Sequence, residues 1–206
     1  MYASLVDQFH WPMALEIWPP YVIPFLGIYI WTRRNERDKR QRTARPDAHD
    51  FDRGSWLFID YGSKAARLVA LVTAFVTPPW VGGSAQLLMY TIGLVAMAAG
   101  TYLRRKCFIA LGEDFTFSVT VSAAQPIVQT GAYRWVRHPS YTGGLLYNIG
   151  IGLVLTNLLS TIVLALTMSA VYAFRVMVEE KALLTQHGES YRQYMRSTKR
   201  FVPFLF

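Results

Sequence analysis

Little charge and almost no cysteine distinguish this sequence of 206 residues. Charged residues make up 17% of it, against about a quarter in an ordinary soluble domain. The single cysteine, Cys107, excludes a disulfide scaffold, and a hydrophobic content of 52% excludes a disordered chain. Internal repeats, low-complexity tracts and Gly-rich phosphate loops are absent, and none of the four histidines has a cysteine neighbour or an i+4 histidine partner. We therefore expect no metal site.

The charge that is present is mostly positive. The sequence has 21 Lys and Arg against 13 Asp and Glu, which gives a net charge of +8 and a pI near 9.7. Such an excess is typical of a nucleic-acid-binding protein when the basic residues share a face with polar neighbours. The positions of the basic residues along the chain therefore decide between a nucleic-acid partner and another role.

Two long runs, 68–103 and 139–174, contain no Asp, Glu, Lys or Arg. One helix of either length would be about 54 Å long, well beyond the ~30 Å hydrocarbon core of a bilayer, so each run is expected to fold back on itself. Turn signals lie at 77–84 and, more weakly, at Thr156-Asn157. We expect two transmembrane hairpins, with arms at about 66–80 and 85–103 and at about 142–156 and 159–178. Because the arms are short, Arg67 and Arg175 are expected to snorkel to the membrane surface.

A further apolar stretch, from Trp11 to Thr32, is interrupted by Glu16 and three prolines. Its most apolar part runs from Ile17 to Trp31, and we expect a kinked first span there, since neighbouring helices can shield a broken backbone. Residues 1–10 carry no Lys or Arg and no small-residue cleavage site follows, so a signal peptide is not expected.

Lys and Arg are confined to alternate polar segments of this five-span arrangement. Ten lie between spans 1 and 2, five between spans 3 and 4, and six from Arg175 onward, whereas the N-terminal segment and both hairpin tips contain none. The positive-inside rule then predicts an outside N-terminus and cytoplasmic large loops and tail, which argues against a nucleic-acid partner. The basic run 33–42 is expected to anchor the chain beside anionic lipid, with a specific headgroup site as the alternative. Cys107 is expected to be a small filler, with palmitoylation as the alternative.

The segment 125–144 places polar and aromatic residues at the mouth of span 4. Residues 119–128 alternate loosely and are expected to be extended, as is His138, because it precedes a proline. An Arg-His pair fixed before a membrane helix can receive an anionic group. The alternative is an interfacial loop whose aromatic residues lie at headgroup level.

A second polar cluster lies where span 5 leaves the membrane. Arg175 and Glu179 share a helix face, and Glu180 lies about 100° further round. They form either a solvated helix end or a cavity in which Arg175 binds an anionic group and Glu179 accepts hydroxyl or ammonium donors. The helix is expected to end at a Gly188 C-cap, before a short amphipathic helix at 190–195 that serves as a lid or packs into the core.

Together these features resemble the isoprenylcysteine carboxyl methyltransferase family and its phospholipid methyltransferase relatives. The resemblance covers roughly residues 104–203 and rests on Leu111-Gly112, the stretch from Gly131 to Gly143, the Glu179-Glu180 pair, Leu183, His187-Gly188, Tyr191, Tyr194 and Pro203. It implies an all-α integral-membrane fold of about five transmembrane helices. S-adenosyl-L-methionine would lie in a cytoplasmic pocket formed by the C-terminal half, and a lipophilic substrate would enter from the bilayer.

The resemblance also implies roles for individual residues. Residues 125–128 would line the adenosine side, although family members often carry a histidine-containing stretch there, and His138 would lie near the cofactor carboxylate. Glu179 would hold cofactor donors, and Arg175 would bind the substrate carboxylate. The implied cofactor-binding set is Gln125, Pro126, Ile127, Val128, Tyr133, Arg137, His138, Pro139, Ser140, Tyr141 and Glu179, and the implied catalytic pair is Arg175 and Glu180.

The chemistry suits these residue types. A carboxylate nucleophile is already deprotonated and needs no general base, so the protein mainly aligns the two reactants, which in favourable cases lowers a barrier by roughly 7–11 kcal/mol. Arg175 can orient a carboxylate bidentately, whereas an amine nucleophile would need Glu180 or Glu179 as proton acceptor. We expect a methyltransferase acting on a lipophilic or prenylated carboxylate. The alternatives are a phospholipid or amine N-methyltransferase, an NADPH-dependent sterol-type reductase and a non-catalytic scaffold.

The expected organisation is a first span with its basic loop (1–64), a transmembrane hairpin (65–103) and a catalytic region (104–206). The expected setting is a bacterial inner membrane, with the bilayer and a lipophilic small molecule as partners.

Overall fold

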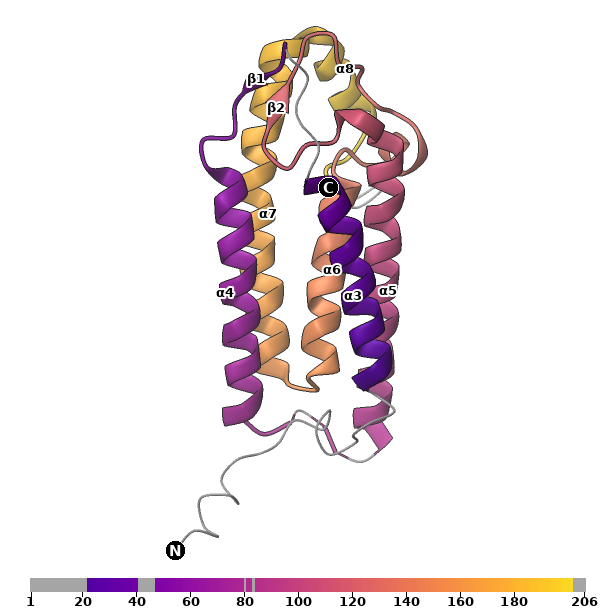
Figure 1. The fold of residues 1–206 in the computed structure, drawn as a ribbon, viewed down its shortest axis with the longest axis vertical. Helices are drawn as coiled ribbons and strands as arrows, with labels where there is room; N and C mark the ends of the chain where they lie inside the picture. Colours follow the sequence, from indigo (N-terminus) through magenta and orange to yellow (C-terminus); the bar gives the residue numbers. More distant parts are fainter. Residues whose placement is uncertain (1–21, 41–46, 80, 83, 202–206) are drawn as a thin grey trace, which may run out of the picture.

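The computed structural model describes residues 22–40, 47–79, 81–82 and 84–201, in which six α-helices make up most of the structure. The five long helices stand side by side as a bundle (Figure 1), and all the remaining elements lie at one end of it. The helices are α3 (Val22–Arg40), α4 (Ser55–Val76), α5 (Ser84–Leu111), α6 (Pro139–Val154), α7 (Leu158–His187) and α8 (Glu189–Ser197). The remaining elements are the two-residue strands β1 (His49–Asp50) and β2 (Thr120–Val121) and the 3₁₀ helices η1 (Gly112–Asp114) and η2 (Gly131–Arg134).

The helical prediction is confirmed, but most of the helices extend beyond the apolar spans. Helix α4 begins at Ser55 rather than near 66, α5 continues to Leu111, and α7 continues to His187. Tertiary contacts stabilise these extensions, such as the Asp52 carboxylate that accepts from the Trp56 N–H at the start of α4, so the end of an apolar run does not end the helix. Two helical segments, Ser84–Asp114 and Leu158–His187, are long and apolar enough to cross a membrane. Residues 11–21 of the first predicted span lie outside the described residues.

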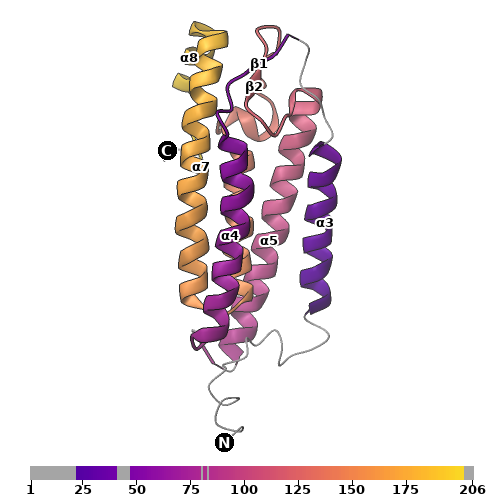
Figure 2. The same ribbon diagram turned by 60° about the vertical axis from the view of Figure 1, so that its left-hand side comes forward.

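The helices pack in pairs that are not all neighbours in sequence. Helix α4 packs on α7, α5 on α6, α6 on α7, and α3 on the outer side of α5 (Figure 2). Between α5 and α6 the approach is close because glycines face each other: a Cβ at Gly150 would lie 2.7 Å from the Gly93 carbonyl oxygen, and one at Gly143 would lie 2.8 Å from that of Gly100. Small residues at helix contacts are typical of helix packing in membranes.

The hairpin tips are tied together at the end away from the strands. Asn157 caps α7 by accepting from the Ser160 N–H at 2.9 Å, and its amide donates to Thr77 Oγ1 at 2.7 Å. Thr156 has a positive φ of 49°, as a turn requires, so the predicted turn at Thr156-Asn157 is confirmed. The predicted Gly188 C-cap is confirmed as well, with φ 52°.

The opposite end holds the small elements that close over the bundle. Strands β1 and β2 pair antiparallel, with His49 opposite Val121, and Val136 forms a parallel bridge with Lys199. The extended conformation predicted for 119–128 is reduced to the two residues of β2. These contacts bring segments from both halves of the sequence over the ends of α4, α5 and α7.

Candidate active site

A cavity of about 1280 Å³, partly open to solvent, lies at the closed end of the bundle between α4, α5 and α7, beneath the segment 114–121. Eight of the predicted site residues line it: Gln125, Tyr133, Arg137, His138, Ser140, Tyr141, Arg175 and Glu179. The other predicted residues, Pro126, Ile127, Val128, Pro139 and Glu180, are not among its lining. The structure therefore brings together the two sequence clusters, but places most of the 125–128 wall elsewhere.

The start of α6 presents His138 and Tyr141 to this cavity. Pro139 occupies the first helical position, where its missing N–H costs no hydrogen bond, and His138 precedes it as the N-cap with φ −124° and ψ 52°. The backbone N–H of His138 donates to the Arg200 carbonyl at 3.0 Å, which fixes the cap against the C-terminal tail. The rings of His138 and Tyr141, one turn apart, stack with centroids 5.7 Å apart.

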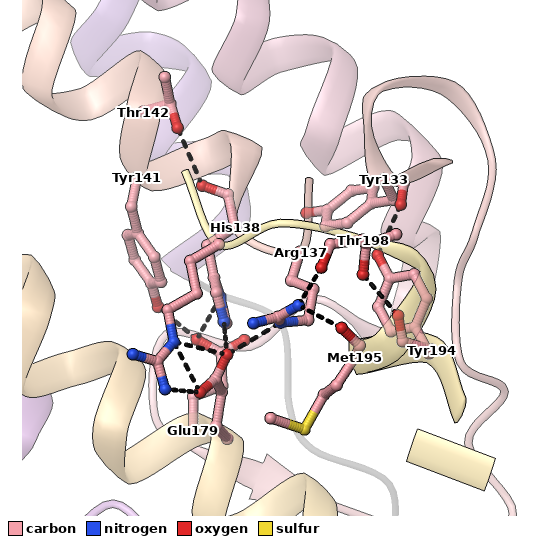
Figure 3. A network of polar contacts seen from close by, with 11 residues as sticks. Tyr133, Arg137, His138, Tyr141, Thr142, Glu179, Tyr194, Met195 and Thr198 are labelled. Carbon is pink, nitrogen blue, oxygen red and sulfur yellow. Dashed lines mark hydrogen bonds and ion pairs between the residues drawn. The ribbon is translucent and has the colours of Figure 1, made fainter. Parts of the chain in front are cut away.

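Glu179 on α7 meets these two side chains (Figure 3). Its Oε2 accepts a hydrogen bond from the Tyr141 hydroxyl at 2.7 Å and lies 3.9 Å from His138 Nδ1. The side chain of Glu179 is 32% exposed, and within the described residues its Oε1 has no hydrogen-bond partner. The site thus offers a carboxylate that is oriented by one oxygen and open at the other.

Arg175 lies one turn before Glu179 and is buried, with 4% of its surface exposed. Its Nη1 donates to Asp52 and Ser55, its Nη2 donates to the Phe117 carbonyl, and its Nε donates to the Tyr141 hydroxyl at 3.4 Å. The snorkelling predicted for Arg175 is wrong, because a buried carboxylate and three further oxygen acceptors replace the water that would otherwise solvate its guanidinium.

Asp52 is a member of this site that the sequence analysis missed. Its carboxylate accepts from Arg175, the Ser55 hydroxyl, the Trp56 N–H at 3.0 Å and the Val119 N–H at 3.0 Å. Burial alone would raise the pKa of Asp52, but the two backbone N–H groups and the Arg175 guanidinium outweigh it and lower the pKa below the ordinary 3.8. Nothing in the sequence indicated it, because the helix that follows Asp52 was expected to start near residue 66 rather than at Ser55.

Glu180, unlike Glu179, has its carboxylate engaged by arginine side chains. It is 4% exposed and accepts from Arg137 Nε at 3.0 Å and from Arg200 Nη2 at 2.8 Å, with His138 Nε2 3.3 Å away. Arg137 also donates to the carbonyls of Met195 and Thr198 (Figure 3). These contacts bind the C-terminal tail to α6 and α7, so the arrangement favours a structural role for Glu180 and Arg137.

Three phenylalanines form a second wall of the cavity, which the sequence analysis missed. Phe108 and Phe115 have ring centroids 4.3 Å apart, and Phe115 and Phe117 have centroids 5.1 Å apart. Tyr133, which is in the predicted set, adds a buried ring from η2, and burial raises the pKa of its hydroxyl well above the ordinary 10. A planar or apolar ligand group has rings to stack on here.

The sequence is similar to the isoprenylcysteine carboxyl methyltransferase (ICMT) family over residues 91–185, which include both polar clusters of the cavity. It is 30% identical over 117 residues to a protein-S-isoprenylcysteine O-methyltransferase of Schizosaccharomyces pombe, covering 56% of this chain and 50% of that protein. The A enzyme of Arabidopsis thaliana is 31% identical over 115 residues, covering 55% of this chain and 58% of that one, so the chain spans about half the length of these relatives.

The fold has a solved counterpart as well. The structure of a eukaryotic intramembrane Ras methyltransferase, ICMT, superposes with a TM-score of 0.65 at 20% sequence identity, covering 92% of this chain and 69% of that one. The likeness thus includes α3 and α4, which lie outside the matched sequence region, and it concerns the fold alone.

Proposed function

We propose that the chain is a member of the isoprenylcysteine carboxyl methyltransferase family, to which residues 91–185 are similar, and that it is an integral-membrane, S-adenosylmethionine-dependent methyltransferase acting on a lipophilic carboxylate such as an isoprenylcysteine. One observation carries the proposal: His138, Tyr141 and Glu179, which come from two separate helices of the matched region, line one cavity with an oriented, half-open carboxylate.

The described residues fit this cofactor. S-adenosylmethionine has an ammonium, a carboxylate and a planar adenine, and the free Oε1 of Glu179 suits the ammonium. The rings of Phe115 and Phe117 suit the adenine, and His138 is proposed for the carboxylate.

When bound, the cofactor supplies an electrophilic methyl group: a carboxylate oxygen bonds to the methyl carbon as the carbon–sulfur bond breaks and its electron pair stays on sulfur, so no proton moves. The protein's task is then to orient the carboxylate and exclude water. Tyr141 is held between Glu179 and Arg175 and fixes the wall they share. The contact predicted between Arg175 and the acceptor carboxylate stays a prediction, and it requires Arg175 to exchange one of its present partners.

The membrane setting is part of the proposal. Large apolar side chains on α4, α5 and α7 are exposed around the bundle, among them Leu68, Val95 and Leu166, and contiguous exposed apolar surface indicates a membrane or protein contact. The cavity lies at the end that carries the basic loops, which the charge asymmetry assigns to the cytoplasm. Five spans, the division at 65 and 104 and the bacterial inner membrane stay predictions.

The test is calorimetry with S-adenosylmethionine on the purified full chain in detergent. We expect Glu179→Ala and His138→Ala each to weaken binding by about tenfold or more, because each removes a polar partner from a sheltered site. Glu189→Ala removes a carboxylate from exposed α8 and serves as the matched control. A wild-type protein that does not bind S-adenosylmethionine contradicts the proposal, and stabilisation by NADPH instead would favour the reductase.

The acceptor is identified by mass spectrometry of lipids incubated with methyl-labelled cofactor. A base-labile methyl ester supports the carboxylate assignment. A methylated amine would instead identify the chain as an N-methyltransferase, for which the engaged carboxylate of Glu180 is a poor proton acceptor.

A further inference from the structure

The cavity ends in a floor made of polar side chains from three helices. Helix α4 runs away from the closed end and contributes Arg67 as its deepest lining residue, whereas α5 and α7 run toward that end and contribute Arg104 and Tyr172. Tyr172 precedes Glu179 by two helical turns, so it lies roughly 10 Å further along α7 than Glu179, and its ring stacks on that of Tyr141 with centroids 5.3 Å apart. The floor therefore contains two guanidinium groups, those of Arg67 and Arg104.

Helix α6 brings these side chains together. Arg67 Nε donates to Asn148 Oδ1 at 3.0 Å, and Asn148, which is 0% exposed, donates in turn to the Gly144 carbonyl at 2.7 Å. At Gly144 a Cβ would overlap the Tyr172 hydroxyl and lie 3.2 Å from Arg104 Nη1, so only glycine lets both groups reach this point. The snorkelling predicted for Arg67 is thus wrong: the side chain turns inward to a buried amide.

Arg67 differs from Arg175 in how many of its hydrogen-bond donors have partners. Every nitrogen of the Arg175 guanidinium donates to an oxygen, including that of a carboxylate. Arg67 has only the neutral Asn148, and across the part of the chain that the structure describes neither of its terminal nitrogens has a hydrogen-bond or ion-pair partner. An ionisable residue inside a membrane bundle normally pairs with an opposite charge. The guanidinium of Arg67 can therefore bind an anionic ligand.

We propose that this floor, formed by Arg67, Arg104 and Tyr172 with Asn148 holding Arg67, binds the carboxylate of the methyl acceptor in place of Arg175. Two terminal N–H groups of one guanidinium match the two oxygens of a carboxylate, and the Asn148 contact at Nε fixes the plane in which they point. Glu179 and His138 line the same cavity and remain available to the cofactor. This assignment rests on the proposed function.

The cofactor has a carboxylate of its own, so the experiment must separate the two sources. The probes are N-acetyl-S-farnesylcysteine, which carries the carboxylate, and its primary carboxamide, which has nearly the same shape without the charge. Their dissociation constants are measured by calorimetry for wild type, Arg67→Gln and Arg67→Lys, and that of S-adenosylmethionine is measured in parallel. Arg105→Gln is the matched control, because Arg105 follows Arg104 in sequence but is exposed and outside the cavity lining.

We expect wild type and Arg105→Gln to prefer the carboxylate over the carboxamide by at least about tenfold, or about 1.4 kcal/mol. In Arg67→Gln this preference should fall to near one, while the affinity for S-adenosylmethionine stays unchanged. Loss of a merely structural arginine would weaken both probes equally and leave their ratio intact. Arg67→Lys keeps the charge but not the planar fork, and should retain only part of the preference; it carries the test if Arg67→Gln does not fold.

Two results overturn the assignment. An unchanged carboxylate preference in both Arg67 variants excludes the floor as the acceptor site, and a loss of S-adenosylmethionine affinity at constant preference assigns the floor to the cofactor's carboxylate. Failure of the proposed function gives a different pattern, since wild type then binds no S-adenosylmethionine at all.

Discussion

Asp52 joins segments that lie far apart in the chain. It accepts from Ser55 and Trp56 within its own segment, from Val119 in the loop over the cavity, and from Arg175, 123 residues away on α7. The carboxylate and the guanidinium are both buried, so each depends on the other for compensation of its charge. Losing one partner of such a pair typically costs about 3–5 kcal/mol, because the remaining charge stays buried.

Acid should therefore destabilise the protein partly through Asp52. A carboxyl whose folded pKa is lowered stabilises the fold fully above its unfolded value, 3.8, and this contribution is lost as the pH falls through the folded pKa. We expect the melting temperature of wild type to fall between about pH 5 and pH 3, a range that brackets this value. At pH 7, Asp52→Asn should have a lower melting temperature than wild type, because its free energy of unfolding is smaller by about 3 kcal/mol or more. On acidification its melting temperature should fall less than that of wild type. The measurement is scanning fluorimetry in detergent across pH.

Glu189→Gln is the control for this experiment. Glu189 pairs with Arg192 and Arg196 on the surface of α8, where both partners are mostly exposed, and such pairs contribute about 1 kcal/mol or less. An Asp52→Asn protein that retains the full wild-type acid dependence would show that other carboxyls account for it.

At the same scale, the sequence predicted the residues that motif and spacing specify but not their distant partners. The i, i+4 spacing placed Arg175 and Glu179 on one face, and the structure agrees. The extended conformation predicted for His138 is wrong, because this residue is the N-cap of α6 with φ −124° and ψ 52°. Asp52 and Asn148 became recognisable only from tertiary contacts, because a lone Asp or Asn in a sequence does not reveal which arginine it meets. Glu179 and Glu180 were indistinguishable by sequence, and only burial separates an open carboxylate from an engaged one.

Among the elements, the contact between α5 and α6 has the least room. A Cβ at Gly100 would overlap the Gly143 carbonyl and lie 2.8 Å from the Tyr147 N–H nitrogen, and backbone atoms cannot move aside as a flexible side chain can. Because His138 and Tyr141 lie on the first turn of α6, the spacing of the two helices also sets the position of the cavity wall.

We expect Gly100→Ala to destabilise the protein by about 1–3 kcal/mol through overpacking. It should also weaken S-adenosylmethionine binding several-fold, since α6 must shift to accommodate the methyl group. Gly27→Ala is the matched control: it lies within α3, a Cβ there meets nothing within 4 Å, and alanine should leave stability equal or raise it by up to about 1 kcal/mol. Melting temperature and calorimetry measure both effects. Equal behaviour of the two variants would contradict the close approach of α5 and α6.

Helix positions were accessible from the sequence because charge-free runs and turn residues mark them. The end of α7 was accessible too, because Gly188 marks its C-cap. The start of α4 was not: the apolar run predicted it at about residue 66, whereas the helix begins at Ser55, next to the Asp52 carboxylate that accepts from the Trp56 N–H. Hydropathy indicates which residues lie in an apolar environment, and the start of α4 depends on tertiary contacts instead.

Across the whole molecule, apolar surface, basic residues and the cavity lie at different positions along the bundle axis. Exposed apolar side chains such as Leu68, Val95 and Leu166 surround its middle, the hairpin tips at Thr77 and Asn157 carry no Lys or Arg, and the cavity opens at the end that holds the basic loops. The proposed enzyme needs this arrangement, because its water-soluble cofactor would arrive from the cytosol and its lipid-soluble acceptor from the bilayer.

The orientation can be tested by single cysteines at opposite ends. Gly82, in the α4–α5 tip, and Gln129, in the loop before η2, are both exposed, and native Cys107 is 1% exposed and should give little background. In bacterial spheroplasts, a membrane-impermeant maleimide should label Gly82→Cys directly, because the tips are expected outside, and should label Gln129→Cys only after permeabilisation. The opposite pattern would place the cavity outside the cell, away from cytoplasmic S-adenosylmethionine, and labelling of both sites in intact spheroplasts would contradict a membrane-spanning bundle.

The predicted pattern requires the 21 basic residues to fix the orientation. Moving three or four of them into the α4–α5 tip should therefore shift part of the population to the reverse labelling.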